Sequence, residues 1–158
     1  MTIILKQFDV PFKFVQRPAP ILADLRPTWR IALLLLMLFH SRGKKASLQK
    51  LHVLSWALQS RHTRNLVCQY SRGEIGGDHV IPRVEPSLNR AIDYARGEGL
   101  VLIAGGKNIV LTETGNAIAR HIQDAEQCME NEKEFLREIS SFVTEQNIEK
   151  LLNWRATT

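Results

Sequence analysis

A chain of 158 residues with 44% hydrophobic and 23% charged residues is long enough to bury a core and has the composition of an ordinary globular domain. Its longest apolar run, residues 31–39, falls well short of the roughly 18 apolar residues that a transmembrane helix needs. The N-terminus also lacks the layout of a signal peptide. We therefore expect a cytoplasmic protein without a membrane anchor.

The net charge of +5 divides unevenly along the chain. Residues 1–72 hold 12 Lys and Arg against 2 Asp and Glu, whereas residues 73–158 hold 9 against 14. A basic half and an acidic half indicate either nucleic acid on one side or docking to oppositely charged proteins. A protein without such partners, in which the solvent-exposed faces of the two halves simply differ in charge, would give the same counts.

Residues 1–27 are predicted to form an extended arm, because the sequence Pro18-Ala19-Pro20 excludes a helix there. The arm carries three phenylalanines, Phe8, Phe12 and Phe14. Apolar surface outside a helix must be covered, so these side chains should contact either the body of the chain or a protein partner.

Residues 28–60 predict two helices. The first runs from about Thr28, a candidate N-cap, to Ser41, and it is apolar on almost every side, as a helix at the centre of a small domain is. Ser47 should cap the second, which runs from Leu48 to Ser60. His52 lies on its apolar stripe and is predicted to be a hydrogen-bonded core histidine and not a ligand or base.

Residues 61–86 predict a helical piece, Thr63 to Tyr70, followed by a loop rich in glycine and proline. The spacing of Gly73, Gly76 and Gly77 follows no strand and opens no helix, so a phosphate-binding loop is disfavoured. The segment is compatible with a loop that shields or replaces a DNA-reading surface.

Residues 87–122 predict a helix, a tight hairpin and a second helix. The first helix spans residues 87–98, with Leu88, Ala91, Ile92 and Ala95 on one face, and Gly97 and Gly99 bracket its end, where a left-handed residue can close the last turn. The strands span residues 100–104 and 109–111 with a turn at Gly105-Gly106-Lys107-Asn108, and Thr112 should cap the second helix, residues 114–122. Gly115 suggests close contact with a neighbouring helix. This order, with the phrases GLV and LTETGNA, resembles the winged-helix family.

The resemblance implies a mainly α fold: a winged helix-turn-helix domain at residues 28–122, with a two-stranded β-hairpin as the wing and a C-terminal helical extension at residues 123–158. In such domains the helix before the hairpin enters the major groove. The nucleic-acid contacts would then be Ser87, Asn89, Arg90, Arg96 and, in the wing, Lys107.

Two acidic residues, Asp93 and Glu98, lie on or near the same surface and would repel phosphate. The wing is short and carries one cation, Lys107. A dedicated DNA reader concentrates its positive charge on the reading element, so a winged-helix DNA-binding transcriptional regulator is the second hypothesis.

The tail predicts a helix over residues 131–145 and a short last helix that includes Trp154. Phe135 and Phe142 fall on the apolar face of the first of these helices. These three aromatic residues are predicted partner contacts, although the tail could equally fold onto its own domain.

Catalytic residues do not form a recognisable constellation. The histidines show no H-x-x-x-H pair, and Cys68 lies among arginines that could lower its pKa but lacks the other parts of a cysteine hydrolase. Cys68 and Cys128 are expected to be reduced. We expect no enzyme activity, no cofactor, no metal and no small-molecule substrate.

Three segments resemble the middle components of bacterial three-component ABC-ATPase systems, which include Lamassu-type antiphage defence. They are RPTWRIALLLLMLFHSRGKKASLQKLHVLSWAL, EPSLNRAIDYARGEGLV, and LTETGNAIARHI with EKEFLREI and KLLNW further on. The resemblance implies a non-catalytic adaptor that binds an SMC- or ABC-type ATPase subunit and an effector subunit, commonly a nuclease. DNA contact would be possible through the complex.

Overall fold

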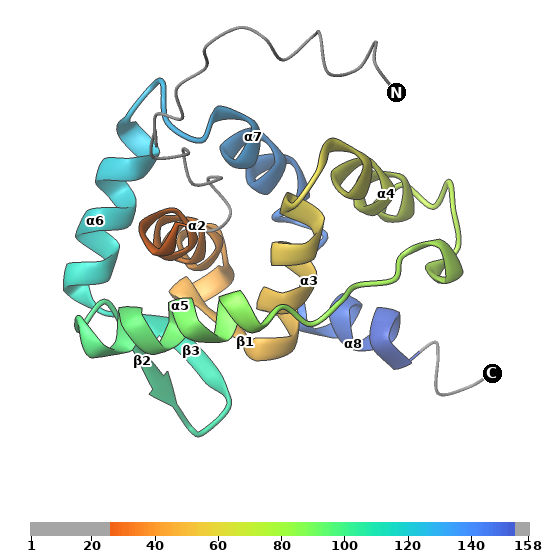
Figure 1. The fold of residues 1–158 in the computed structure, drawn as a ribbon. Coiled ribbons are helices and arrows are strands. Elements are labelled where there is room, and N and C mark those ends of the chain that lie inside the picture. The colour runs from red at the N-terminus through yellow and green to blue at the C-terminus, as the bar shows by residue number, and fades with distance from the viewer. Residues whose placement is uncertain (1–25, 154–158) are drawn as a thin grey trace, which may run out of the picture.

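The computed structural model describes residues 26–153, and within this range the chain is mainly helical with one small antiparallel sheet (Figure 1). The helices are α2 (Pro27–Phe39), α3 (Leu48–Leu58), α4 (Arg61–Ser71), α5 (Pro86–Gly97), α6 (Glu113–Asp124), α7 (Glu130–Ile139) and α8 (Glu145–Asn153). The strands are β1 (Lys45–Ser47), β2 (Val101–Ala104) and β3 (Asn108–Leu111). Short 3₁₀ turns lie at Arg42–Lys44 (η2) and Gly77–His79 (η3). The predicted mainly α class is confirmed.

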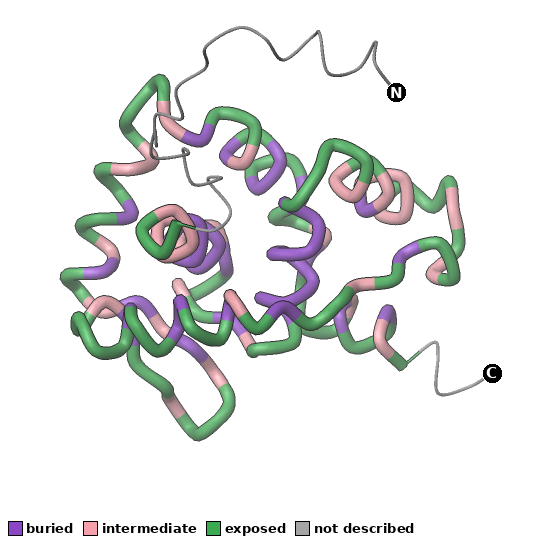
Figure 2. The backbone as a smooth tube through the Cα atoms, in the orientation of Figure 1, coloured by how far each residue is buried: buried purple, intermediate pink, exposed green. Residues whose placement is uncertain are grey.

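Helix α2 is the centre of the molecule. Residues 33–38 are all buried, none more than 5% exposed, and α3, α5, α6, α7 and β3 all contact the helix. Figure 1 looks nearly along α2, and Figure 2 shows the buried sides of its neighbours turned toward it. The prediction of Thr28 as the N-cap is wrong, because Pro27 is already the first helical residue. The fixed φ of proline and its missing N–H suit this first position of a helix.

The sheet has three strands in the order β1-β3-β2, and β1 was not predicted. In the register, Ala46 is opposite Ile109 on one side of β3, and Ile103 is opposite Ile109 on the other. Three residues of β1 are too few for an alternating pattern to be visible in the sequence. The hairpin turn is as expected, with Gly105 and Gly106 at φ of 61° and 69°.

Helix α5 ends in the turn that the glycines predicted. Gly99 is left-handed at φ 72°, its N–H donates to the Arg96 carbonyl at 3.1 Å, and the Leu100 N–H donates to the Ala95 carbonyl at 2.8 Å. This pair of bonds is a Schellman motif. It reverses the chain so that β2 begins directly after the helix.

Thr112 connects this turn to the next helix. Its hydroxyl accepts from the Gly115 N–H at 3.0 Å, which confirms the predicted cap, and donates to the Gly99 carbonyl at 2.6 Å. A Cβ on Gly115 would lie 1.9 Å from the Leu100 carbonyl oxygen. Gly115 therefore marks a close approach, as predicted, but to the backbone before β2 and not to a helix.

The C-terminal helices fold onto the rest of the chain. Phe135, Ile139, Val143 and Ile148 belong to the same core as α2. The predicted helix over residues 131–145 is wrong in its end: α7 stops at Ile139, and a turn precedes α8.

The predicted partner contacts divide among three situations. Phe135 is only 4% exposed, so its side chain is not available to a partner. Phe142 is half-buried, and its ring meets the Tyr70 ring edge-on at 5.7 Å. Trp154, the three arm phenylalanines and almost all of the arm itself lie outside the described residues.

We predict that Gly115→Ala lowers the free energy of unfolding by about 3 kcal/mol, because the added methyl group would overlap the Leu100 carbonyl. Urea unfolding measures the loss. Gly97→Ala is the matched control: Gly97 lies in α5, and a Cβ there meets nothing within 4 Å. The control should gain roughly 0.5–1 kcal/mol, and equal effects for the two variants would contradict the packing.

Candidate binding interface

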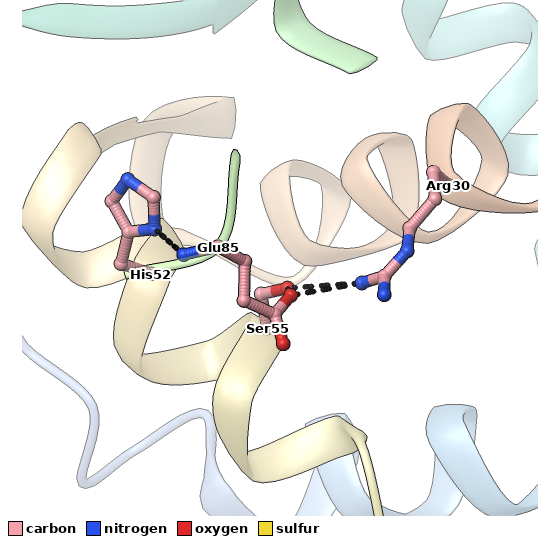
Figure 3. A network of polar contacts seen from close by, with 4 residues as sticks. All are labelled: Arg30, His52, Ser55 and Glu85. Carbon is pink, nitrogen blue, oxygen red and sulfur yellow. Dashed lines mark hydrogen bonds and ion pairs between the residues drawn. The ribbon is translucent and has the colours of Figure 1, made fainter. Parts of the chain in front are cut away.

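A buried ion pair holds the start of α5 against the two central helices. The Glu85 Oε2 atom accepts from Arg30 Nη1 of α2 at 2.9 Å and from the Ser55 hydroxyl of α3 at 2.7 Å (Figure 3). The two charged side chains are 12% and 8% exposed. Glu85 is the residue before the first turn of α5, so this pair fixes where the helix begins.

His52 of α3 supports the same junction. Its Nδ1 accepts from the Glu85 backbone N–H at 3.4 Å (Figure 3), which confirms the prediction of a hydrogen-bonded core histidine. Burial lowers the pKa of His52, while a hydrogen bond with Asn89 and the charge of Glu85 raise it by less.

Helix α5 buries one face and exposes the other. The buried side chains are Leu88, Ala91, Ile92 and Ala95, the stripe on which the helix was predicted. Of the predicted nucleic-acid contacts, Asn89, Arg90 and Arg96 are exposed on α5, Ser87 is half-buried in its first turn, and Lys107 is exposed in the hairpin turn. Asp93 and Glu98 are exposed as well.

Large apolar side chains are exposed on the same stretch of chain. Within residues 26–153 there are seven such side chains, and five of them lie between residues 81 and 103. They are Ile81 at 52% and Val84 at 72% in the loop before α5, Tyr94 at 55% on α5, and Leu102 at 46% and Ile103 at 42% on β2. Together with the exposed face of α5, we call these five side chains the α5 surface.

The five apolar residues of the α5 surface were not predicted as contacts. The sequence held a signal for three of them. Ile81 and Val84 are apolar residues within a loop rich in proline, and Tyr94 lies off the buried stripe of α5. The five residues lie on α5, on the loop before it and on the strand after it, and exposed apolar residues that gather on one surface mark interaction sites.

No group of three or more His, Cys, Asp or Glu side chains within residues 26–153 could hold a metal ion. Burial and the nearby Glu138 raise the pKa of the Cys68 thiol, and Arg72 lowers it by less. The expectation that arginines would lower this pKa is therefore wrong, and both Cys68 and Cys128 are free thiols.

No helix among residues 26–153 has the length and hydrophobicity to span a bilayer. Comparisons with protein-family models, with curated proteins and with solved structures found no match to this chain.

We predict that Arg30→Met costs about 3–5 kcal/mol in the free energy of unfolding, because it leaves the Glu85 carboxylate buried without its cation. Adding Glu85→Gln should restore part of the lost stability, because it removes the buried negative charge.

The matched control is Arg72→Met. It breaks the ion pair between Arg72 and Glu138, which has a similar length of 2.8 Å but joins side chains that are 56% and 50% exposed. It should cost less than about 1 kcal/mol. Similar losses for Arg30→Met and Arg72→Met would contradict the role of the buried pair.

We predict that stability falls as the pH is lowered from about 7 to about 5.5. Burial lowers the pKa of His52 and of His40, whose Nε2 lies 2.8 Å from the Gln123 side-chain oxygen. The unfolded chain therefore binds protons first as the pH falls through the usual value of about 6.5. The loss continues until the pH passes below the lowered values of the native state.

Urea unfolding at several pH values measures this slope. The double variant His40→Gln/His52→Gln should show a flatter dependence than the wild type. His62→Gln changes an exposed histidine of α4 and serves as the control. The same slope in the wild type and the double variant would show that His40 and His52 do not cause the loss.

Proposed function

We propose that residues 27–124 form a winged-helix domain. The order of elements supports this: α2, β1 and α3 come first, α5 follows, and the β2–β3 hairpin comes next as the wing, with β1 pairing to β3. Helix α4 and the loop at residues 72–85 are then an insertion between the second helix of the motif, α3, and its third, α5. This assignment of the elements agrees with the resemblance of the sequence phrases GLV and LTETGNA to the winged-helix family.

We further propose that the protein is a non-catalytic adaptor that binds other proteins through the α5 surface. The observation that carries this proposal is the exposure of Val84, Tyr94, Leu102 and their neighbours on the elements that a winged-helix DNA reader would use. Apolar side chains contribute nothing to phosphate contacts, whereas apolar and aromatic groups at the centre of a protein interface supply most of its binding energy.

The partners that we propose follow from the family resemblance. They are an SMC- or ABC-type ATPase subunit and an effector subunit, commonly a nuclease, in a cytoplasmic antiphage defence complex. The uneven charge of the chain, basic in residues 1–72 and acidic in residues 73–158, suits a subunit placed between two partners of different charge.

DNA binding is the second candidate function, and a specific observation favours it too. The side chains of Arg90, Arg96 and Lys107 are exposed around the same surface, and each can contact a phosphate or a base edge. Asp93 and Glu98 oppose it, since both are exposed nearby. The two functions make different demands on the same surface and can be separated by mutation.

We predict that Ile81→Ser/Val84→Ser weakens binding to the ATPase or effector subunit encoded beside this chain by about 2 kcal/mol, roughly thirtyfold. Both side chains are exposed, so the fold should be retained. Ile118→Ser, at a side chain 38% exposed on α6 and outside the α5 surface, is the matched control. Titration of the purified subunits measures the affinity.

The DNA function predicts a different result. The chain alone would bind duplex DNA with an affinity that falls steeply with salt, and Arg90→Ala/Lys107→Ala would abolish that binding. DNA binding by the isolated chain, together with no binding to either neighbouring subunit, would overturn the adaptor proposal.

A further inference from the structure

A second surface, separate from α5, has the features of an anion-binding pocket. It is a hollow of about 820 Å³ between η2 and β1 on one side and the turn that joins α7 to α8 on the other. Hollows of this size hold small ligands in many proteins. Its charged and hydroxyl-bearing lining includes Arg42, Lys45, Lys50, Ser141, Thr144 and Glu145.

Lys50 is unusual among the lysines within residues 26–153. It lies in the first turn of α3 and is only 6% exposed, yet its ammonium group has no hydrogen bond or ion pair within this range. Lys133, equally buried, donates from Nζ to the Ala125 carbonyl, and Lys44 donates to the Phe39 carbonyl at 2.7 Å. The Nζ atom of Lys50 is not among the fully buried side-chain atoms that lack a partner. Lys50 therefore combines a mostly buried side chain with an ammonium group that is free to bind a ligand in the hollow.

The balance of charge in the hollow favours an anion. Arg42 and Lys45 are exposed at its rim and form no ion pair within the described residues. The one acidic side chain in the lining is Glu145, and both of its oxygens are engaged: they accept from the Ser47 N–H at 3.0 Å and the Ser47 hydroxyl at 2.6 Å. Three cations against one carboxylate leave the hollow positive.

The surroundings of Lys50 point the same way. Burial lowers the pKa of Lys50, and the charge of Glu145 offsets this only in part. An anion in the hollow would stabilise the charged ammonium. The Ser141 and Thr144 hydroxyls line the same hollow and can donate to an oxygen-rich anion.

We propose that this hollow binds the phosphate group of a small ligand, with Lys50 as the central cation and Arg42 and Lys45 at the rim. A phosphate has enough oxygens to accept from several donors at once, which suits three cations with hydroxyls beside them. The site does not depend on the α5 surface. Its failure would leave the adaptor proposal intact, and the reverse also holds.

The test is calorimetric titration of the full chain with ATP and, separately, with inorganic phosphate, against sodium chloride at matched ionic strength. Saturable binding of either ligand is expected. Lys50→Met should weaken it at least tenfold. Lys150→Met makes the same substitution at an exposed lysine of α8 outside the lining and should leave the affinity unchanged. Competition between the two ligands distinguishes a nucleotide site from a free phosphate site.

Lys50→Met should also raise the melting temperature of the ligand-free protein, because burial disfavours the charged ammonium and methionine keeps an unbranched side chain of similar shape without the charge. If this variant fails to fold, Arg42→Met/Lys45→Met, which changes only exposed side chains, should still weaken binding. The proposal is overturned if neither ligand binds saturably, if Lys50→Met binds like the wild type, or if only duplex DNA binds.

Discussion

The burial of α2 on nearly every side is the constraint on which the rest of the structure depends. Six consecutive residues, 33–38, are at most 5% exposed, and a helix without a polar face must be surrounded. Helices α3, α5, α6 and α7 each bring an apolar stripe to it. A chain of this size has a single core, and that is why the C-terminal helices pack on this domain and do not form a separate arm.

Helix α5 is held at both ends by polar and steric devices, while its outer face stays free. At its start, Glu85 is paired with Arg30 in the interior. At its end, the Gly99 turn, the Thr112 hydroxyl and the close approach of Gly115 to Leu100 fix the path into β2. A surface intended for binding gains affinity when its backbone is ordered beforehand, because less entropy is lost on association.

Local signals predicted most of this architecture. The periodic stripe of α5, the caps at Ser47 and Thr112 and the left-handed Gly99 all have causes within a few residues of sequence. What the sequence could not predict depends on long-range pairing. Strand β1 exists because β3 offers it an edge, and the pairing of Arg30 with Glu85 joins residues that are 55 positions apart. The unpaired state of Lys50 likewise emerges only when α3 meets the turn after α7.

The exposed surface of α5 shows why the candidate DNA contacts, and not the apolar ones, could be named from the sequence. Arg90, Arg96 and Lys107 are conspicuous in sequence because charge is a property of single residues. Exposed apolar area is not: Leu102 and Ile103 look like core residues of a strand until the fold leaves them 46% and 42% accessible. A surface that mixes these side chains with Asp93 has a weaker electrostatic attraction for phosphate and a larger apolar area to bury. Since apolar burial contributes about 25 cal/mol per Å², we expect a protein partner to gain more from this surface than a nucleic acid would, as the adaptor proposal requires.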